Sequence, residues 1–114
     1  MAGRRAAPRR IVVSQDLTPL LKPFSCKSLQ LANRVAMAPM TRMRSPGYVP
    51  NDEVAGYYRR RAEGGVGLII TEGTTVNHKA ANGYEQVPAF HGEALTGWKQ
   101  VVDDVHAAGG SIVP

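Results

Sequence analysis

The segment VAMAPMTRMR, residues 35–44, joins a short apolar run to an abrupt polar continuation. Residues 35–39 form a strand pattern that is too apolar to leave one face in water, which is typical of a parallel sheet covered on both faces. Pro39 has no backbone N–H to give to a neighbouring strand, so we expect the strand to end there. The hydroxyl of Thr41 and the guanidinium of Arg42 follow at once. The segment therefore predicts a buried strand whose carboxyl end presents polar groups.

A helix is predicted after the polar loop that follows this strand. Asn51 is a typical N-cap residue, and Asp52 places a negative charge in the first turn, where the helix dipole favours it. Residues spaced i, i+3, i+4 and i+7 define one face of this helix: Val54, Tyr57, Tyr58 and Arg61. Gly64 and Gly65 then supply a stop.

A second apolar strand, residues 66–71, and a second helix, residues 93–108, continue the alternation. The apolar residues expected to form the buried stripe of the second helix are Leu95, Trp98, Val102 and Val105. Residues 109–110 are glycines that end this helix, and residues 111–114 open a third strand. Strands that alternate with helices imply right-handed crossovers and a parallel sheet.

Two parallel architectures compete for this pattern. A dinucleotide-binding fold would have a Gly-rich turn directly after its first strand, whereas the cluster GGVG at residues 64–67 precedes the second strand. A (β/α)₈ barrel has long loops after its strands and short turns before them, which fits better. Residues 22–33 alternate apolar and polar residues around a turn, which predicts a hairpin that could close the bottom of the barrel. The predicted fold class is thus α/β: an incomplete (β/α)₈ TIM barrel, made of an N-terminal hairpin and the first β-α-β-α-β units.

Length and composition bound the class of protein. A chain of 114 residues with 43% apolar and 20% charged residues has room for one ordinary globular domain. A whole barrel typically needs about 250 residues, so three strands would leave unpaired edges and an uncovered apolar face. No apolar run approaches the roughly 20 residues of a membrane span, and the single Cys26 cannot form an internal disulfide. We therefore expect a cytoplasmic protein without a membrane segment.

The net charge of +5 is concentrated at the amino terminus. Four of the fourteen basic residues lie in the first ten positions, which contain no acid, so ten basic residues face nine acidic ones in the rest of the chain. We interpret residues 1–16 as a disordered basic arm and residues 17–114 as the barrel portion, with no nucleic-acid partner. A phosphate-binding arm is the alternative, which a steep salt dependence of binding would reveal. A transit peptide fits less well, because the segment is short and lacks an amphipathic face.

Residues at the carboxyl ends of barrel strands face the active site. These positions are Pro39, Met40, Thr41 and Arg42 after the first strand, and Thr71, Glu72 and Gly73 after the second. The set contains no nucleophile paired with a base and no cluster of metal ligands, but Gly73 permits close approach of a flat group. It resembles one wall of a site for a planar cofactor. We interpret Glu72 as a structural carboxylate that meets an arginine such as Arg42, in preference to an acid catalyst.

Three runs resemble the beginning of the Old Yellow Enzyme family of NAD(P)H:flavin oxidoreductases: LANRVAMAPMTRMRSPG, PNDEVAGYYRRRAEGGVGLIITEGTTV and GWKQVVDDVHAAGG. The resemblance covers roughly residues 20–114. It implies an FMN-binding (β/α)₈ barrel that takes NAD(P)H as reductant and reduces activated alkenes (enones) by hydride transfer from reduced FMN. The cofactor-binding residues that it implies are Ala38, Pro39, Met40, Thr41 and Gly73. In the family the hydroxyl matching Thr41 hydrogen-bonds a flavin carbonyl, and the position matching Gly73 contacts the flavin through its backbone. At His91 the chain departs from the family, which often has an aromatic residue there.

The resemblance also implies what these residues lack. The flavin-binding glutamine, the substrate-binding pair and the proton-donating tyrosine of the family match no position here, so we expect no catalytic residue within this chain and no activity from its 114 residues alone. One alternative is a non-catalytic flavin-binding module or a split-barrel partner, which would join a complementing C-terminal half. A homo-oligomer and a non-enzymatic basic protein that acts through its arginine arm also remain open. The expected small-molecule partner of the whole protein is an activated alkene.

Overall fold

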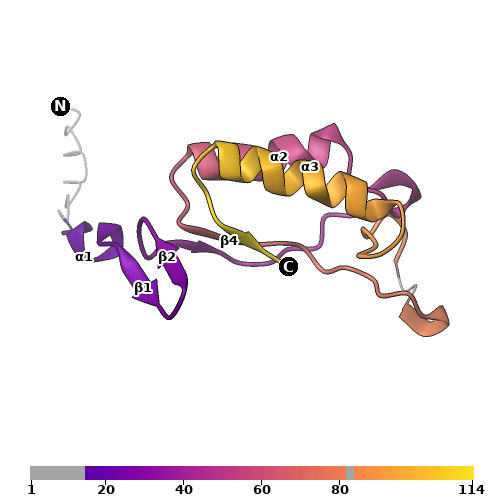
Figure 1. Ribbon diagram of the computed structural model, residues 1–114, viewed down its shortest axis with the longest axis horizontal. Coiled ribbons are helices and arrows are strands. Elements are labelled where there is room, and N and C mark those ends of the chain that lie inside the picture. The colour runs from indigo at the N-terminus through magenta and orange to yellow at the C-terminus, as the bar shows by residue number, and fades with distance from the viewer. Residues whose placement is uncertain (1–14, 82–83) are drawn as a thin grey trace, which may run out of the picture.

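The computed structural model describes residues 15–81 and 84–114, in which helices and strands alternate from the first parallel strand onward, as the sequence predicts (Figure 1). The elements in chain order are α1 (Thr18–Leu21), β1 (Phe24–Cys26), β2 (Leu29–Leu31), β3 (Ala36–Met37), η1 (Pro46–Tyr48), α2 (Asp52–Glu63), β4 (Leu68–Ile70), η2 (Lys79–Ala81), α3 (Ala94–Ala107) and β5 (Ile112–Val113). The predicted arm falls mainly on residues 1–14, which lie outside the described residues.

Strands β3, β4 and β5 form one parallel sheet in that order. Ile69 stands at the centre of the sheet, beside Met37 on one side and Ile112 on the other. The backbone N–H of Thr71 donates to the carbonyl of Val113 at 2.9 Å and extends the pairing beyond the strands themselves. This order confirms the incomplete α/β barrel, and the described residues contain no closed barrel.

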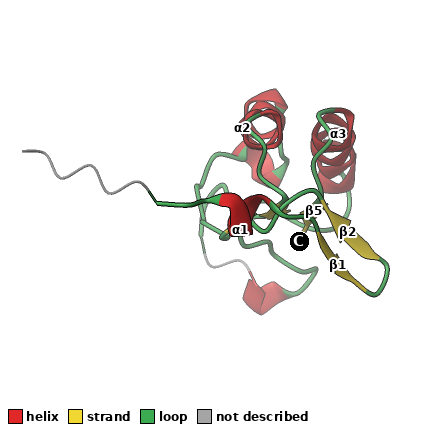
Figure 2. Ribbon diagram, turned by 90° about the vertical axis from the view of Figure 1, so that its left-hand side faces the viewer, coloured by secondary structure: helices red, strands yellow, loops and turns green. Residues whose placement is uncertain are grey.

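Helices α2 and α3 lie side by side over one face of the sheet, which Figure 2 shows almost along the helix axes. The core between helices and sheet consists mainly of Val54, Tyr58, Ile69, Trp98, Val101 and Val105, each nearly or fully buried. No described element covers the opposite face, and Val35 is 38% exposed. Among the described residues, helices therefore cover one face of the sheet alone, which agrees with the uncovered apolar face expected of three strands, and coverage of the first strand on both faces stays a prediction.

The ends of α2 follow the sequence prediction. The side-chain oxygen of Asn51 accepts a hydrogen bond from the N–H of Val54 at 3.1 Å, which satisfies one of the free donors of the first turn. The helix ends at Glu63, and Gly65 turns the chain with φ +90°, in the region that favours glycine.

The buried stripe of α3 differs from the one predicted. Its buried members are Ala94, Trp98, Val101 and Val105, while Val102 is partly buried and Leu95 is 48% exposed. Leu95 was thus predicted wrongly. The physical reason lies at Gly97, where a Cβ atom would fall well inside van der Waals contact with the carbonyl oxygen of Pro50. The glycine lets this side of α3 approach the start of α2, and the whole helix is rotated accordingly.

The predicted hairpin is present as β1 and β2, which pair antiparallel. It lies beyond the amino ends of β3 and β4, on the left in Figure 1. The side chain of Asn33 ties its exit to the turn before β4, because its amide donates to the carbonyl of Gly65 at 2.7 Å. Across the two described ranges, every helix falls short of the length and apolarity that crossing a membrane requires.

Candidate functional site

The loops after β3 and β4 converge at the carboxyl edge of the sheet. A Cβ atom built on Gly73 would lie 3.6 Å from the hydroxyl oxygen of Thr41. Both residues are exposed, so the backbone of Gly73 and the hydroxyl of Thr41 form one accessible surface. The structure therefore brings together the two residues for which the sequence predicts contacts with a planar group.

Glu72 is buried directly behind this surface. Glu72 is 2% exposed, and its Oε2 accepts a hydrogen bond from the backbone N–H of Arg42 at 3.0 Å. The Nε of Arg42 lies 3.9 Å from the other carboxylate oxygen, Oε1. This ion pair confirms the predicted meeting of Glu72 with Arg42, and the structural role of the carboxylate stays an interpretation.

Tyr58 anchors the second loop to α2. Its hydroxyl oxygen accepts a hydrogen bond from the backbone N–H of Glu72 at 2.9 Å. Burial raises the pKa of Tyr58 to about 12, with a smaller upward effect from the negative charge of Glu72, while the hydrogen bond from the Glu72 backbone acts in the opposite direction. The phenol therefore stays neutral at physiological pH and serves as a structural acceptor.

Tyr57 holds two guanidinium groups. The Cζ of Arg42 lies 3.6 Å from the centre of its ring, and the Cζ of Arg61 lies 3.5 Å from the same centre. Two groups cannot share one face at such distances, so they occupy opposite faces and sandwich the ring, each in a cation–π contact. The helical spacing predicts a shared face for Tyr57 and Arg61 and no partner for the tyrosine ring. The i, i+4 spacing of Tyr57 and Arg61 was the signal that could have revealed half of this arrangement.

The remaining predicted cofactor residues lead from β3 to Thr41. Ala38, Pro39 and Met40 are exposed, Met40 by 56%. No described element covers them, so they continue the accessible surface along the first loop. Their contact with a cofactor stays a prediction.

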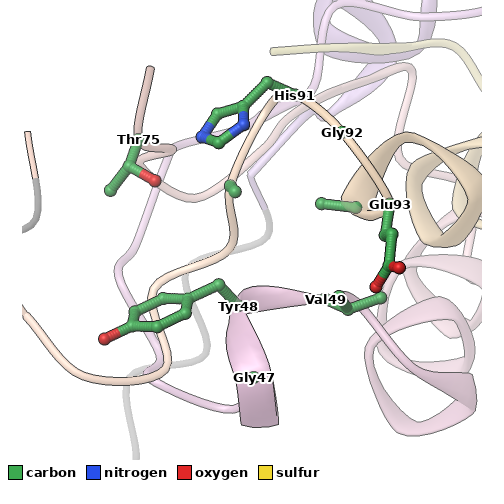
Figure 3. Close-up of a pocket in the computed structure, with 9 residues that line it drawn as sticks. Gly47, Tyr48, Val49, Thr75, His91, Gly92 and Glu93 are labelled. Carbon is green, nitrogen blue, oxygen red and sulfur yellow. The ribbon is translucent and has the colours of Figure 1, made fainter. Parts of the chain in front are cut away.

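A separate cavity of about 370 Å³ lies between η1 and the start of α3 (Figure 3). Its ionisable residues are Tyr48, His91 and Glu93, and Figure 3 shows the imidazole turned toward Thr75 and the carboxylate on another side, near Val49. Neither Thr41 nor Gly73 lines it. It is therefore distinct from the surface at the ends of β3 and β4.

The part of the chain that the structure describes contains no candidate metal-binding site. No three His, Cys, Asp or Glu side chains gather there in a way that could hold a metal ion. The candidate site is thus a hydroxyl, a glycine backbone and a short exposed loop, backed by a buried ion pair. Such a surface can orient a flat ligand and donate or accept one hydrogen bond.

A family model for the NADH:flavin oxidoreductase / NADH oxidase family matches residues 19–113, most of the chain. The chain belongs to this family. Among curated members, 12-oxophytodienoate reductase 7 of Oryza sativa subsp. japonica is 44% identical over 97 residues, which are 84% of this chain and 24% of that protein. Chanoclavine-I aldehyde reductase fgaOx3 of Penicillium roqueforti is 43% identical over 98 residues, or 84% of this chain and 26% of that protein.

Solved structures of family members share the fold. Morphinone reductase in complex with tetrahydroNAD superposes with a TM-score of 0.75 at 44% identity, covering 82% of this chain and 25% of that one. Old Yellow Enzyme from Pichia sp. AKU4542 gives a TM-score of 0.75 at 33% identity, with the same coverage. The chain thus spans about a quarter of the length of the family members that it matches, and its fold is the opening part of their TIM barrel.

Proposed function

We propose that the chain forms the FMN-facing N-terminal segment of an NAD(P)H-dependent flavin oxidoreductase that reduces activated alkenes such as enones. The observation that carries this proposal is the 3.6 Å approach of the Thr41 hydroxyl to the Cβ position of Gly73. This distance is an ordinary van der Waals contact, so the two loops end side by side, and glycine leaves its exposed backbone accessible to a flat ring. Family membership supports the identity of that ring as flavin.

The residues present fit an FMN ring along one side. Thr41 would hydrogen-bond a flavin carbonyl, Gly73 would contact the ring through its backbone, and Ala38, Pro39 and Met40 would line the exposed edge between them. FMN, when bound, supplies the hydride chemistry, and the protein contributes binding, orientation and electrostatics. Morphinone reductase in complex with tetrahydroNAD supports a nicotinamide nucleotide as the reductant.

The 114 residues alone are proposed to be inactive. Hydride transfer requires reacting atoms held about 3–3.5 Å apart, and residues on one side of a ring cannot fix a substrate on the other. Among the described residues, no proton donor for a substrate stands at the surface formed by Thr41 and Gly73. The buried acid behind that surface, Glu72, is paired with Arg42. The choice of alkene would then depend on residues beyond those that this chain shares with its relatives.

The test is the visible absorption and fluorescence of FMN titrated with the purified chain. Binding beside Thr41 should shift the flavin absorption band and quench its fluorescence, and Thr41→Val should reduce the shift while Thr41→Ser retains it, because serine keeps the hydroxyl. Thr96→Ala, an exposed change on α3, is the matched control. Flavin spectra that stay unchanged by the unaltered chain, or that respond equally to the valine variant, would contradict the proposal.

A split-barrel partner is the second candidate function, and the outer edges of β3 and β5 favour it. Neither edge has a strand partner among residues 15–81 and 84–114. An apolar cavity of about 220 Å³ lies beside β5, lined by Trp98, Val102 and Val113 among others. A complementing polypeptide can be made from morphinone reductase by removing the quarter that this chain matches. Flavin binding by the mixture and by neither part alone would favour this function, and sedimentation would separate it from a homo-oligomer.

A further inference from the structure

One hydrogen bond joins the two loops of the candidate site. Its donor, the N–H of Arg42, comes directly after Thr41 in the chain, and its acceptor, the Glu72 carboxylate, directly precedes Gly73. The bond is 3.0 Å long and connects loops that are 30 residues apart in sequence. Because each bonded residue is the chain neighbour of Thr41 or Gly73, this bond sets the distance between Thr41 and Gly73.

Both residues of this hydrogen bond also contact side chains of α2. The backbone N–H of Glu72 donates to the hydroxyl of Tyr58 at 2.9 Å, and the guanidinium of Arg42 stacks on the ring of Tyr57. The two tyrosine rings meet edge to face with centres 5.2 Å apart. A binding surface is held most accurately when its supporting residues sit on rigid elements, and here a helix of twelve residues carries them.

Stability alone explains this arrangement poorly. The Oε1 of Glu72 and the Nε of Arg42 are both buried without a hydrogen-bond partner, and the 3.9 Å between them is too long for one. Buried ion pairs contribute little to stability, because the cost of desolvation offsets their attraction and apolar residues of similar volume do as well. What the carboxylate does provide is an acceptor at a fixed place for the N–H of Arg42.

We propose that Glu72 is a positioning residue, which holds Thr41 beside Gly73 by accepting the backbone N–H of Arg42. Arg42 and Tyr58 fix its side chain and its backbone in turn. The identity of the ring that this surface receives, FMN, rests on the proposed function. The mechanical role of Glu72 rests on the hydrogen bonds alone.

The experiment measures amide hydrogen exchange at residue 42 in the full chain, together with FMN affinity. Glu72→Gln keeps an acceptor of nearly the same shape, whereas Glu72→Leu keeps the volume and removes the acceptor. Glu63→Gln is the matched control, because Glu63 also pairs with an arginine but in solvent. We expect the leucine variant to speed exchange at residue 42 and to weaken FMN binding by about tenfold each, and the glutamine and control variants to change both less than about threefold.

Each outcome decides the proposal. An Arg42 amide that exchanges in the unaltered chain as fast as in a free peptide would overturn it, and so would Glu72→Leu that frees the amide without weakening FMN. If circular dichroism shows that Glu72→Leu is unfolded, the double variant Arg42→Met/Glu72→Leu replaces it, because it removes both charges and keeps the backbone donor. Failure of the unaltered chain to bind FMN would contradict the proposed function, while the exchange pattern would still establish or refute the role of Glu72.

Discussion

The side chain of Glu72 is fully buried, and the cation paired with it is Arg42, whose own side chain is 13% exposed. A carboxylate in such surroundings loses its hydration and depends on its counter-ion and its hydrogen bond for compensation. At the scale of single residues, the stability of the fold is thus sensitive to loss of the guanidinium that pairs with Glu72.

Arg42→Met removes the guanidinium and keeps the backbone N–H that Glu72 accepts. Because the buried carboxylate then lacks its counter-ion, we expect the free energy of unfolding to fall by about 3 kcal/mol. Adding Glu72→Gln, which removes the charge and retains an acceptor, should recover much of that loss. Urea unfolding of the double-mutant cycle measures the coupling. Arg44→Met, at an exposed position of the same loop, is the control and should change stability by less than about 0.5 kcal/mol. Equal costs for the two arginines would contradict a functional ion pair at Glu72.

Tyr58 should make the free energy of unfolding decrease as the pH rises into the alkaline range. Its pKa is raised from 10.0 in the unfolded chain to about 12 in the fold, so the unfolded state loses the phenolic proton first as the pH rises. The contribution of Tyr58 is therefore fully present below pH 10 and is lost as the pH rises from 10 to about 12. The loss in unfolding free energy should be about 2 kcal/mol.

Urea unfolding of the unaltered chain and of Tyr58→Phe across this pH range isolates the effect. Tyr58→Phe should already be destabilised by about 1–3 kcal/mol below pH 10, because the N–H of Glu72 loses its acceptor. Its stability should then fall less steeply with pH than that of the unaltered chain. Tyr84→Phe, at a residue 70% exposed, should leave the slope unchanged. Parallel pH slopes for Tyr58→Phe and the unaltered chain would show that the phenol ionises alike in both states.

At the scale of elements, the closeness of α2 and α3 depends on a residue without a side chain. The backbone of α3 at Gly97 faces the buried Pro50, whose carbonyl oxygen occupies the space that a Cβ atom would need. Trp98, the next residue, donates its indole N–H to the carbonyl of Ala89 at 2.8 Å and fixes the same helix against the second loop. The approach of the two helices is thus set within a single turn of α3.

Gly97→Ala should destabilise the chain although alanine is the better helix former. Alanine gains about 1 kcal/mol in helix propensity, but the clash with a backbone oxygen forces the helices apart and costs more, about 1–3 kcal/mol beyond that gain. Thermal unfolding of Gly97→Ala beside Thr96→Ala, an exposed position in the same turn, measures the difference. A higher melting temperature for Gly97→Ala would mean that α3 does not pack closely on Pro50.

Gly97 also marks the limit of what the sequence could predict for this element. Local patterns predicted the helix itself and the glycines that end it, because helix stops depend on nearby residues alone. The face of α3 depends on its neighbour, and the buried stripe through Ala94 and Val101 is rotated by roughly 50° from the one through Leu95 and Val102, at about 100° per residue. A glycine within a helix indicates that another segment packs closely against it, but the sequence does not show which segment that is.

The candidate site was predictable to a similar depth. The positions of Thr41 and Gly73 follow from the alternation of strands and helices, because parallel strands end at the same edge of a sheet. The pairing of Glu72 with Arg42 follows from the same register. The stacking of two arginines on Tyr57 depends on how α2 is rotated over the loop. The helical period of the sequence predicts which face of α2 is buried, but it does not predict which atoms meet.

At the scale of the whole molecule, the described residues divide into a packed body and a hairpin at its amino end. The body buries Ile69 completely between α2, α3 and the sheet. The hairpin has three-residue strands, and every residue of β1 is exposed. Its apolar side chains Phe24 and Leu31 meet Val35 and Leu68 across a cavity of about 350 Å³, so little apolar surface holds it to the body.

Hydrogen exchange should therefore separate two units of different stability. Ile69→Val removes one buried methylene group and should cost about 1 kcal/mol, which speeds exchange about fivefold for amides that open only when the core unfolds. Amides within α2 and α3 should show this change. Those of Cys26 and Leu29, which form a hydrogen-bonded pair within the hairpin, should exchange faster at the outset and at the same rate in both proteins, because they open locally. Val76→Ala, at a residue 64% exposed, should affect neither set. Were the hairpin amides to accelerate together with the helices, the hairpin and the body would unfold as one unit, and its few contacts at Val35 and Leu68 would be stronger than their exposure implies.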